Sequence, residues 1–598
     1  MIGSGAGGGP VAANLAKAGR RVLVIEAGGR GDNPQSRFKY SVPGANARTD
    51  QDLGWAYWVN SRAGQADRER QHFYVPGKGL YYPRGSTIGG STAVHALISV
   101  YPDNRDWDAI ADLTGDRSWQ SPAMRPYFER LENARYVPPE AGNPGRHGFS
   151  GWLPLEQVGI RGNLLKDERL TDYVVSRVRG EQNGDLFESA AREGRDFRAD
   201  PNDWRFVGAR RTGLVDLPRS TLDGARRGTR DLLLETHAQH PDNLEILTDC
   251  LVSRLLFADG DKARVIGVEY LEGQHLYGAS WRAEEFAGRG GVRRQVRATR
   301  EVILSAGAFN SPQILMLSGI GPAGELRRHG IPVRVDRPGV GRNLQDRLET
   351  GVVCRLPFEP DIYKGCTWGA GDDPCRAEFE SGAPEGAYRS RLIRQTYMIK
   401  RSSPDRTVPN LATFGTVGRF RGYYHPTRAP TSGKDEFTWF TLSGHTSNNG
   451  GTVTLKSASP RETPEINFNN FEDGSDLEGK DLEALLSGVK MARRIAAGGA
   501  DGPAEGEISP GPDCRSNDDL RQFIKNEAWG HHASCSNRMG PAHDPMAVVG
   551  PDFKVHGVGG LRIVDASIFP RIPGLYIVLP IYMIAEKASD VILAEVSA

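Results

Sequence analysis

Three glycines at the start of the chain have the spacing of a phosphate-binding turn. Gly3, Gly5 and Gly8 follow the pattern G-x-G-x-x-G. In nucleotide-binding proteins this pattern forms the turn between a strand and a helix, where backbone N–H groups and the positive helix end hold a pyrophosphate. Glu26 comes eighteen residues after Gly8, close to where an acidic side chain binds a ribose hydroxyl. These residue types predict a dinucleotide site.

The segments after the turn have the order that such a site requires. Residues 10–19 (PVAANLAKAG) have helical spacing, and residues 20–29 (RRVLVIEAGG) contain a short apolar strand. This order favours a nucleotide-binding turn over a flexible glycine-rich start. Only Met1 and Ile2 precede the turn, so its leading strand, which would lie at the centre of a parallel sheet, is nearly absent. We expect that the native chain begins further upstream; the alternative is that another segment fills the gap.

Length and charge narrow the class of protein. A chain of 598 residues is too long for one ordinary core, so two domains are expected. The 75 Lys and Arg residues nearly equal the 74 Asp and Glu residues. A net charge of +1 gives no reason to expect nucleic acid or an anionic membrane as a partner. No apolar run has transmembrane length.

The six cysteines indicate neither a disulfide framework nor a zinc site. Cys366 and Cys375 could pair within a local loop, but the low cysteine density leads us to expect free thiols. The cysteines lack zinc-ligand spacing, so no metal site is predicted. Because no secretory signal is recognised either, we expect a cytoplasmic protein.

Four separated segments together resemble the glucose–methanol–choline (GMC) oxidoreductases, a family of FAD-dependent alcohol oxidases and dehydrogenases. The first is the glycine turn with Glu26. The second, residues 85–108, follows the family's first signature but departs from it at Ser86 and Ser99. The third, residues 307–321 (GAFNSPQILMLSGIG), fits the second signature throughout. The fourth combines HASCSNRMG with the later stretches VDASIFPRIPG and MIAEKASD. The segments occur in the family's order.

The resemblance implies an α/β fold (α+β overall) with two domains. A Rossmann-like FAD-binding domain would be discontinuous and formed by residues 1–150, 225–345 and 525–598. A discontinuous substrate-binding domain with an antiparallel sheet would be formed by residues 151–224 and 346–524. The middle of the chain carries no motif that aligns with the family, so the resemblance indicates the chemistry but not the alcohol.

The resemblance also implies that FAD is bound non-covalently. Members with covalent FAD carry the linking histidine one residue before the position of His95, and that position is Val94 here. The helix that begins near Pro580 would favour the negative charge that develops on the reduced flavin. The residues expected to contact the cofactor are Gly3, Gly5, Gly8, Glu26, Gly90, Ser91, His95, Val252, Asp565, Ala566 and Val578.

By the same resemblance, His532 is the candidate base. The family places its catalytic histidine seven residues before a Met-Gly pair, and Met539 with Gly540 puts it at His532. Histidine is well suited to take a proton near neutral pH. His531 is the adjacent competitor. Neighbours in an extended segment point in opposite directions, so only one of the two is expected to face the flavin.

The sequence departs from the family at a second polar position. Most members have His or Asn near the start of the last helix, and the alignment puts Val578 there. Three interpretations follow. His532 could act alone; Asn537, His531 or His95 could supply the second contact; or the chemistry could differ from ordinary alcohol oxidation.

The function implied is oxidation of a primary or secondary alcohol, with hydride transfer to flavin N5 while a histidine takes the hydroxyl proton. The electron acceptor would be O2 or a quinone, and the substrate a small molecule. Two alternatives remain: a flavin-bearing lyase of the hydroxynitrile-lyase type, and a non-catalytic flavoprotein.

Overall fold

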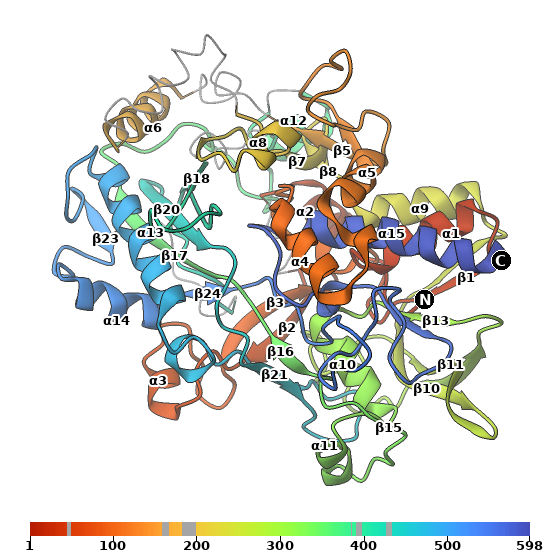
Figure 1. Cartoon of the computed structure of the whole chain (residues 1–598). Helices are drawn as coiled ribbons and strands as arrows, with labels where there is room; N and C mark the ends of the chain where they lie inside the picture. The colour runs from red at the N-terminus through yellow and green to blue at the C-terminus, as the bar shows by residue number, and fades with distance from the viewer. Residues whose placement is uncertain are drawn as a thin grey trace.

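The computed structural model describes residues 1–44, 50–157, 167–181, 199–383, 386–389, 397–425 and 433–597. A nucleotide-binding region and an antiparallel sheet lie side by side in it (Figure 1). The expected combination of a Rossmann-like region and an antiparallel-sheet region is confirmed. In the described residues, no helix is both long and apolar enough to cross a membrane.

Short parallel strands form the centre of the nucleotide-binding region. Strand β1 (Val22–Ile25) pairs with β9 (Leu244–Leu247), and β13 (Val302–Leu304) pairs with β25 (Leu561–Ile563). Ile2 forms parallel bridges to both β1 and β13 and so joins the two pairs. The central position beside the glycine turn is therefore occupied by the residues that directly precede this turn.

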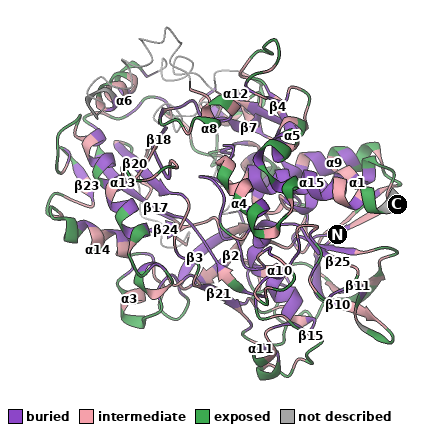
Figure 2. Cartoon of the chain, viewed as in Figure 1, coloured by how far each residue is buried: buried purple, intermediate pink, exposed green. Residues whose placement is uncertain are grey.

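Three helices pack beside these strands. Helix α1 (Gly8–Lys17) contacts α9 (Thr229–Gln239) and α15 (Val578–Ser597), and the three lie together in Figure 1. Small and apolar residues of α1 are buried, so the helix can approach both neighbours closely. Figure 2 shows α15 mostly in the colour of buried residues, as expected for a helix at the centre of a domain.

The second region is an antiparallel sheet. Its strand order is β23 (Glu507–Ser509), β17 (Leu348–Arg355), β20 (Glu436–Ser443), β19 (Leu411–Val417), β18 (Met398–Lys400) and β6 (Gly213–Leu214). Strand β24 (Trp529–Gly530) pairs with β17.

Both faces of this sheet are covered. Helix α13 (Lys480–Ala496) packs on one face, where its side chains join a core cluster with Phe437 and Trp439. Phe440 and Leu442 belong to a different cluster, because successive side chains of a strand point to opposite faces. The face opposite α13 is therefore the one that can contribute side chains to the wall of a site.

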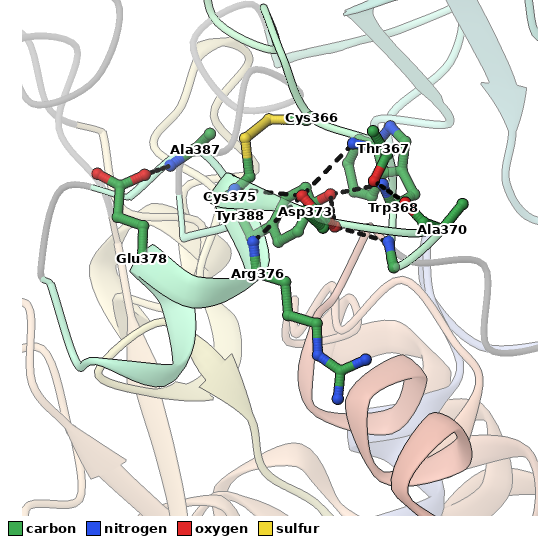
Figure 3. Close-up of a disulfide and its surroundings, with 11 residues drawn as sticks. Cys366, Thr367, Trp368, Ala370, Asp373, Cys375, Arg376, Glu378, Ala387 and Tyr388 are labelled. Atoms are coloured by element: carbon green, nitrogen blue, oxygen red, sulfur yellow. Dashed lines mark hydrogen bonds between the residues drawn. A yellow bond between two sulfur atoms is a disulfide. The ribbon is translucent and has the colours of Figure 1, made fainter.

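The expectation of free thiols at Cys366 and Cys375 is wrong, because these two residues form a disulfide with a Cα–Cα distance of 5.3 Å. Cysteine density over a whole chain does not predict the pairing of two cysteines only nine residues apart. Asp373 shapes the loop between them by accepting hydrogen bonds from the backbone N–H groups of Thr367 and Gly369 (Figure 3). The other four cysteines are free.

Candidate active site

A cavity of about 610 Å³ is lined by residues from both regions. The glycine turn and the start of α15 lie on one side, and strands β17, β19 and β20 contribute to the other. A site in this position can hold a cofactor on the nucleotide-binding region and a second molecule against the sheet.

The glycine turn has the geometry of a phosphate cradle. Gly3 has a φ of +89°, and a Cβ there would lie 2.5 Å from the carbonyl oxygen of Ser305. At Gly5 a Cβ would meet nothing within 4 Å, because this residue faces the cavity. No side chain caps the N-terminus of α1. The first N–H groups of the helix can therefore bind an anion.

Gly8 is the one predicted cofactor residue that does not line the cavity. A Cβ at Gly8 would collide with the carbonyl oxygen of Gly3. This glycine therefore allows the helix to pack against the turn instead of contacting a ligand. The other ten predicted residues all line the cavity: Gly3, Gly5, Glu26, Gly90, Ser91, His95, Val252, Asp565, Ala566 and Val578.

Two buried carboxyl groups organise the cofactor side. Glu26 accepts hydrogen bonds from the backbone N–H of Ser4 at 3.1 Å and from that of Gly28 at 2.9 Å. Asp565 accepts from the backbone N–H of Gly307 and from the hydroxyl of Ser311. Burial raises the pKa of both carboxyl groups, although these hydrogen bonds oppose the shift. Both acids hold loops that border the cavity.

The residues present fit an FAD. A turn for the pyrophosphate and an acid for a ribose lie in one cavity with two buried ring nitrogens, His95 Nε2 and His532 Nδ1. Neither nitrogen has a hydrogen-bond partner among the residues that the structure describes. Val94 also lines the cavity and offers no atom for a covalent link. Buried polar groups without a partner, on residues that line a cavity, are candidates for contact with a ligand.

His531 and His532 both line the cavity, with ring centroids 4.0 Å apart. The expectation that adjacent side chains would point in opposite directions fails because β24 ends at Gly530. The backbone N–H of His532 donates to Asp346 at 2.7 Å, so the chain is no longer paired as a strand. Burial, followed by the effects of His531 and Arg347, lowers the pKa of His532 well below its usual value.

Glu349 is the functional candidate that sequence reasoning missed. It lies on β17 opposite Leu442, and its Oε1 is 3.5 Å from Nε2 of His531. Burial raises the pKa of Glu349 to about 8; Asp346 adds to this effect and Arg347 opposes it. The available signal was the single acidic residue of this strand, LETGVVCR, since a carboxyl group is rarely buried without a role.

Asn537 is not brought into the cavity. Its side chain is fully buried and donates to the hydroxyl of Ser567 at 3.1 Å. By contrast, Val578 lines the cavity at the first residue of α15. The resemblance predicts a polar group at this position, and the valine side chain supplies none.

The cavity wall opposite the cofactor side is aromatic. The ring of Tyr576 lies 5.7 Å from that of His532 at nearly a right angle. The aromatic residues that border this part are Phe414, Phe420, Tyr423, Phe440 and Tyr576. Such a wall excludes water and suits a small molecule with an apolar part.

Glu349, His531 and His532 are also residue types that can hold a metal ion, and one ligand atom of each lies within 4.8 Å of the others. The absence of a metal site stays a prediction.

Comparison with known proteins shows that two family models match the chain. Both are described as GMC oxidoreductase; one covers residues 20–349 and the other residues 447–585.

Curated relatives match over nearly the full chain. An oxygen-dependent choline dehydrogenase from Pseudomonas putida is 31% identical, covering 99% of this chain and 93% of the relative. One from Brucella anthropi is 29% identical, with 99% and 95% covered.

Solved structures share the fold at lower identity. A formate oxidase from Aspergillus oryzae superposes with a TM-score of 0.77 at 23% identity, covering 99% of this chain and 97% of the other. A pyridoxine 4-oxidase from Mesorbium loti gives a TM-score of 0.72 at 23% identity, with 98% and 97% covered.

Proposed function

The chain belongs to the GMC oxidoreductase family, and we propose that this FAD-dependent enzyme oxidises a primary or secondary alcohol with His532 as the base. The observation that carries the proposal is the position of His532. Its ring lines the cavity that holds the phosphate-binding turn, and its buried Nδ1 has no hydrogen-bond partner in the described part of the chain.

The surroundings of His532 suit a proton acceptor. The lowered pKa keeps the imidazole neutral at physiological pH, and a neutral imidazole can take the hydroxyl proton. His531 and Arg347 contribute to this shift after burial. The hydrogen bond from the backbone N–H of His532 to Asp346 fixes the segment that carries the ring.

When bound, FAD would supply the hydride acceptor, flavin N5, for oxidation of the carbinol carbon. The cofactor would be held non-covalently, since Val94 stands where a linking histidine would lie. The positive end of the helix dipole at the start of α15 would favour the negative charge of a reduced flavin. The residues proposed to hold FAD are Gly3, Gly5, Glu26, Gly90, Ser91, His95, Val252, Asp565, Ala566 and Val578.

The substrate would lie between the histidines and the sheet. We assign the FAD-binding domain to residues 1–150, 225–345 and 525–598, and the substrate-binding domain to residues 151–224 and 346–524. The name of the choline dehydrogenase relatives, "oxygen-dependent", supports O2 as electron acceptor; a quinone is the second candidate.

Anaerobic reduction of the bound flavin tests this function. The purified protein is mixed without oxygen with choline, and separately with neutral primary and secondary alcohols of similar size. We expect at least one alcohol to bleach the flavin absorbance, and air to restore the colour if O2 is the acceptor. A panel that leaves the oxidised spectrum unchanged, in a protein with full FAD content, contradicts the proposal.

A further inference from the structure

A single base accounts for removal of the hydroxyl proton but not for the orientation of the alcohol oxygen in this cavity. The oxygen that loses its proton must be oriented during the reaction, because a small misplacement costs much of the rate. The valine side chain of Val578 lines the cavity but can neither donate nor accept a hydrogen bond. A second polar group that orients this oxygen must therefore come from another element.

His531 is a polar side chain that lies directly beside the proposed base. The two rings are 4.0 Å apart between centroids, and both line the cavity. Asn537 is held by Ser567 outside the cavity. His95 lines the cavity but comes from the segment of Gly90 and Ser91 on the cofactor side.

Neighbouring side chains hold the His531 ring in place. Glu349, fixed on β17 by pairing with β20 and β24, brings its Oε1 to 3.5 Å from Nε2 of His531. The ring of Tyr423 meets that of His531 edge-on at 5.4 Å. A carboxyl group that fixes an imidazole ring in this way is a recurring device for orienting histidines.

We propose that His531, oriented by Glu349, makes the second polar contact to the alcohol oxygen that Val578 cannot make. This inference rests on the proposed function. The proton still passes to His532, and His531 contributes a hydrogen bond without changing its own charge. In these terms His531 is a catalytic residue, and Glu349 is a positioning residue that acts through it.

A double-mutant cycle tests whether the two residues act as a unit. His531→Gln and Glu349→Gln should each slow anaerobic flavin reduction, by roughly 10- to 100-fold for His531→Gln and less for Glu349→Gln. The double variant should be no slower than His531→Gln alone, because the carboxyl group acts only through the ring. Wild-type rates in both single variants, or penalties that multiply in the double variant, overturn the inference.

A rescue experiment distinguishes a polar contact made by His531 from a merely structural role of this residue. In wild type, Val578→Asn should lower the rate by crowding the cavity. In the His531→Ala background the same change should raise the rate several-fold, because an amide returns the missing contact. Val578→Leu, which adds bulk without polarity, is the matched control and should give no recovery. Recovery with Leu as well as Asn, or with neither, contradicts the inference.

The two proposals fail in different ways. If His532→Ala reduces its flavin at the wild-type rate, the proposed function is wrong. If His532→Ala is slow while His531→Gln and Glu349→Gln are unaffected, only the present inference is wrong. A slow His95→Gln beside a normal His531→Gln would assign the second contact to His95 instead. FAD content and melting temperature are measured for every variant.

Discussion

At the scale of single residues, the buried carboxyl group of Glu349 makes the stability of the fold depend on pH. Its pKa is raised to about 8 by burial and by Asp346. In the unfolded chain, the same carboxyl group has the ordinary pKa of a glutamate. Between about pH 4.5 and pH 8 the folded state therefore keeps a proton that the unfolded state loses. Stability from this group is present at low pH and falls as the pH rises through this window.

Glu349→Gln removes this dependence, because an amide does not titrate. We expect the variant to gain stability relative to wild type as the pH is raised from 5 to 8, by a few kcal/mol at most. Melting temperatures measured across this range test the prediction. A difference between variant and wild type that is constant with pH would show that the carboxyl titrates normally in the folded protein.

A second prediction at this scale concerns Val94. Because valine cannot form a bond to the flavin, the purified protein should release intact FAD on treatment with acid or heat. The measurement is the flavin absorbance of the supernatant after denaturation, with the mass of the released flavin as a control. Yellow colour that stays with the protein pellet would contradict non-covalent binding.

At the scale of elements, the disulfide between Cys366 and Cys375 restrains a loop that borders the cavity. Trp368 and Tyr388 both line the cavity and stack on each other at 4.6 Å. Tyr388 also donates a hydrogen bond to Asp373 within the loop (Figure 3). The covalent link thus holds part of the cavity wall.

Cys375→Ser should lower the free energy of unfolding by up to about 3 kcal/mol, the chain-entropy value for a loop of this length. Cys514→Ser, at a free and partly exposed cysteine, is the control and should change little. Denaturant unfolding of both variants and wild type measures the effect. Equal stability of Cys375→Ser and wild type would mean that the link does not restrain the loop.

Helices and strands were predictable where the hydrophobic pattern of their own residues determines them. Helical spacing over residues 10–19 anticipates α1 at Gly8–Lys17, and the apolar run before Glu26 anticipates β1 at Val22–Ile25. The shared direction of His531 and His532 was not predictable, because it depends on where β24 stops pairing with β17.

At the scale of the whole molecule, the sequence patterns located the glycine turn and its acid beside the cavity but did not locate the wall that the sheet forms. The turn and its acid lie within one local unit, so their spacing is visible in the sequence. Glu349 meets His531 only through the pairing of distant strands β17 and β24. That pairing follows from tertiary packing, which a short sequence motif does not predict.

The cavity is lined by segments from Ile2 to Ile581, so FAD should stabilise the whole fold. Removing FAD should lower the melting temperature by several degrees. Adding it back at about 100 times its Kd should restore roughly 3 kcal/mol. AMP, which can occupy only part of the cavity, is the control and should give a smaller gain. Melting temperatures that are equal with and without FAD contradict a cofactor that spans these segments.

The rate of anaerobic flavin reduction in His532→Ala tests the central claim most directly. We expect a loss of roughly two to four orders of magnitude, the usual contribution of a general base, with FAD content unchanged. His543→Ala, at an exposed histidine, should reduce its flavin at the wild-type rate. A wild-type rate in His532→Ala, or a loss of this size in His531→Ala alone, would contradict the assignment of His532 as the base.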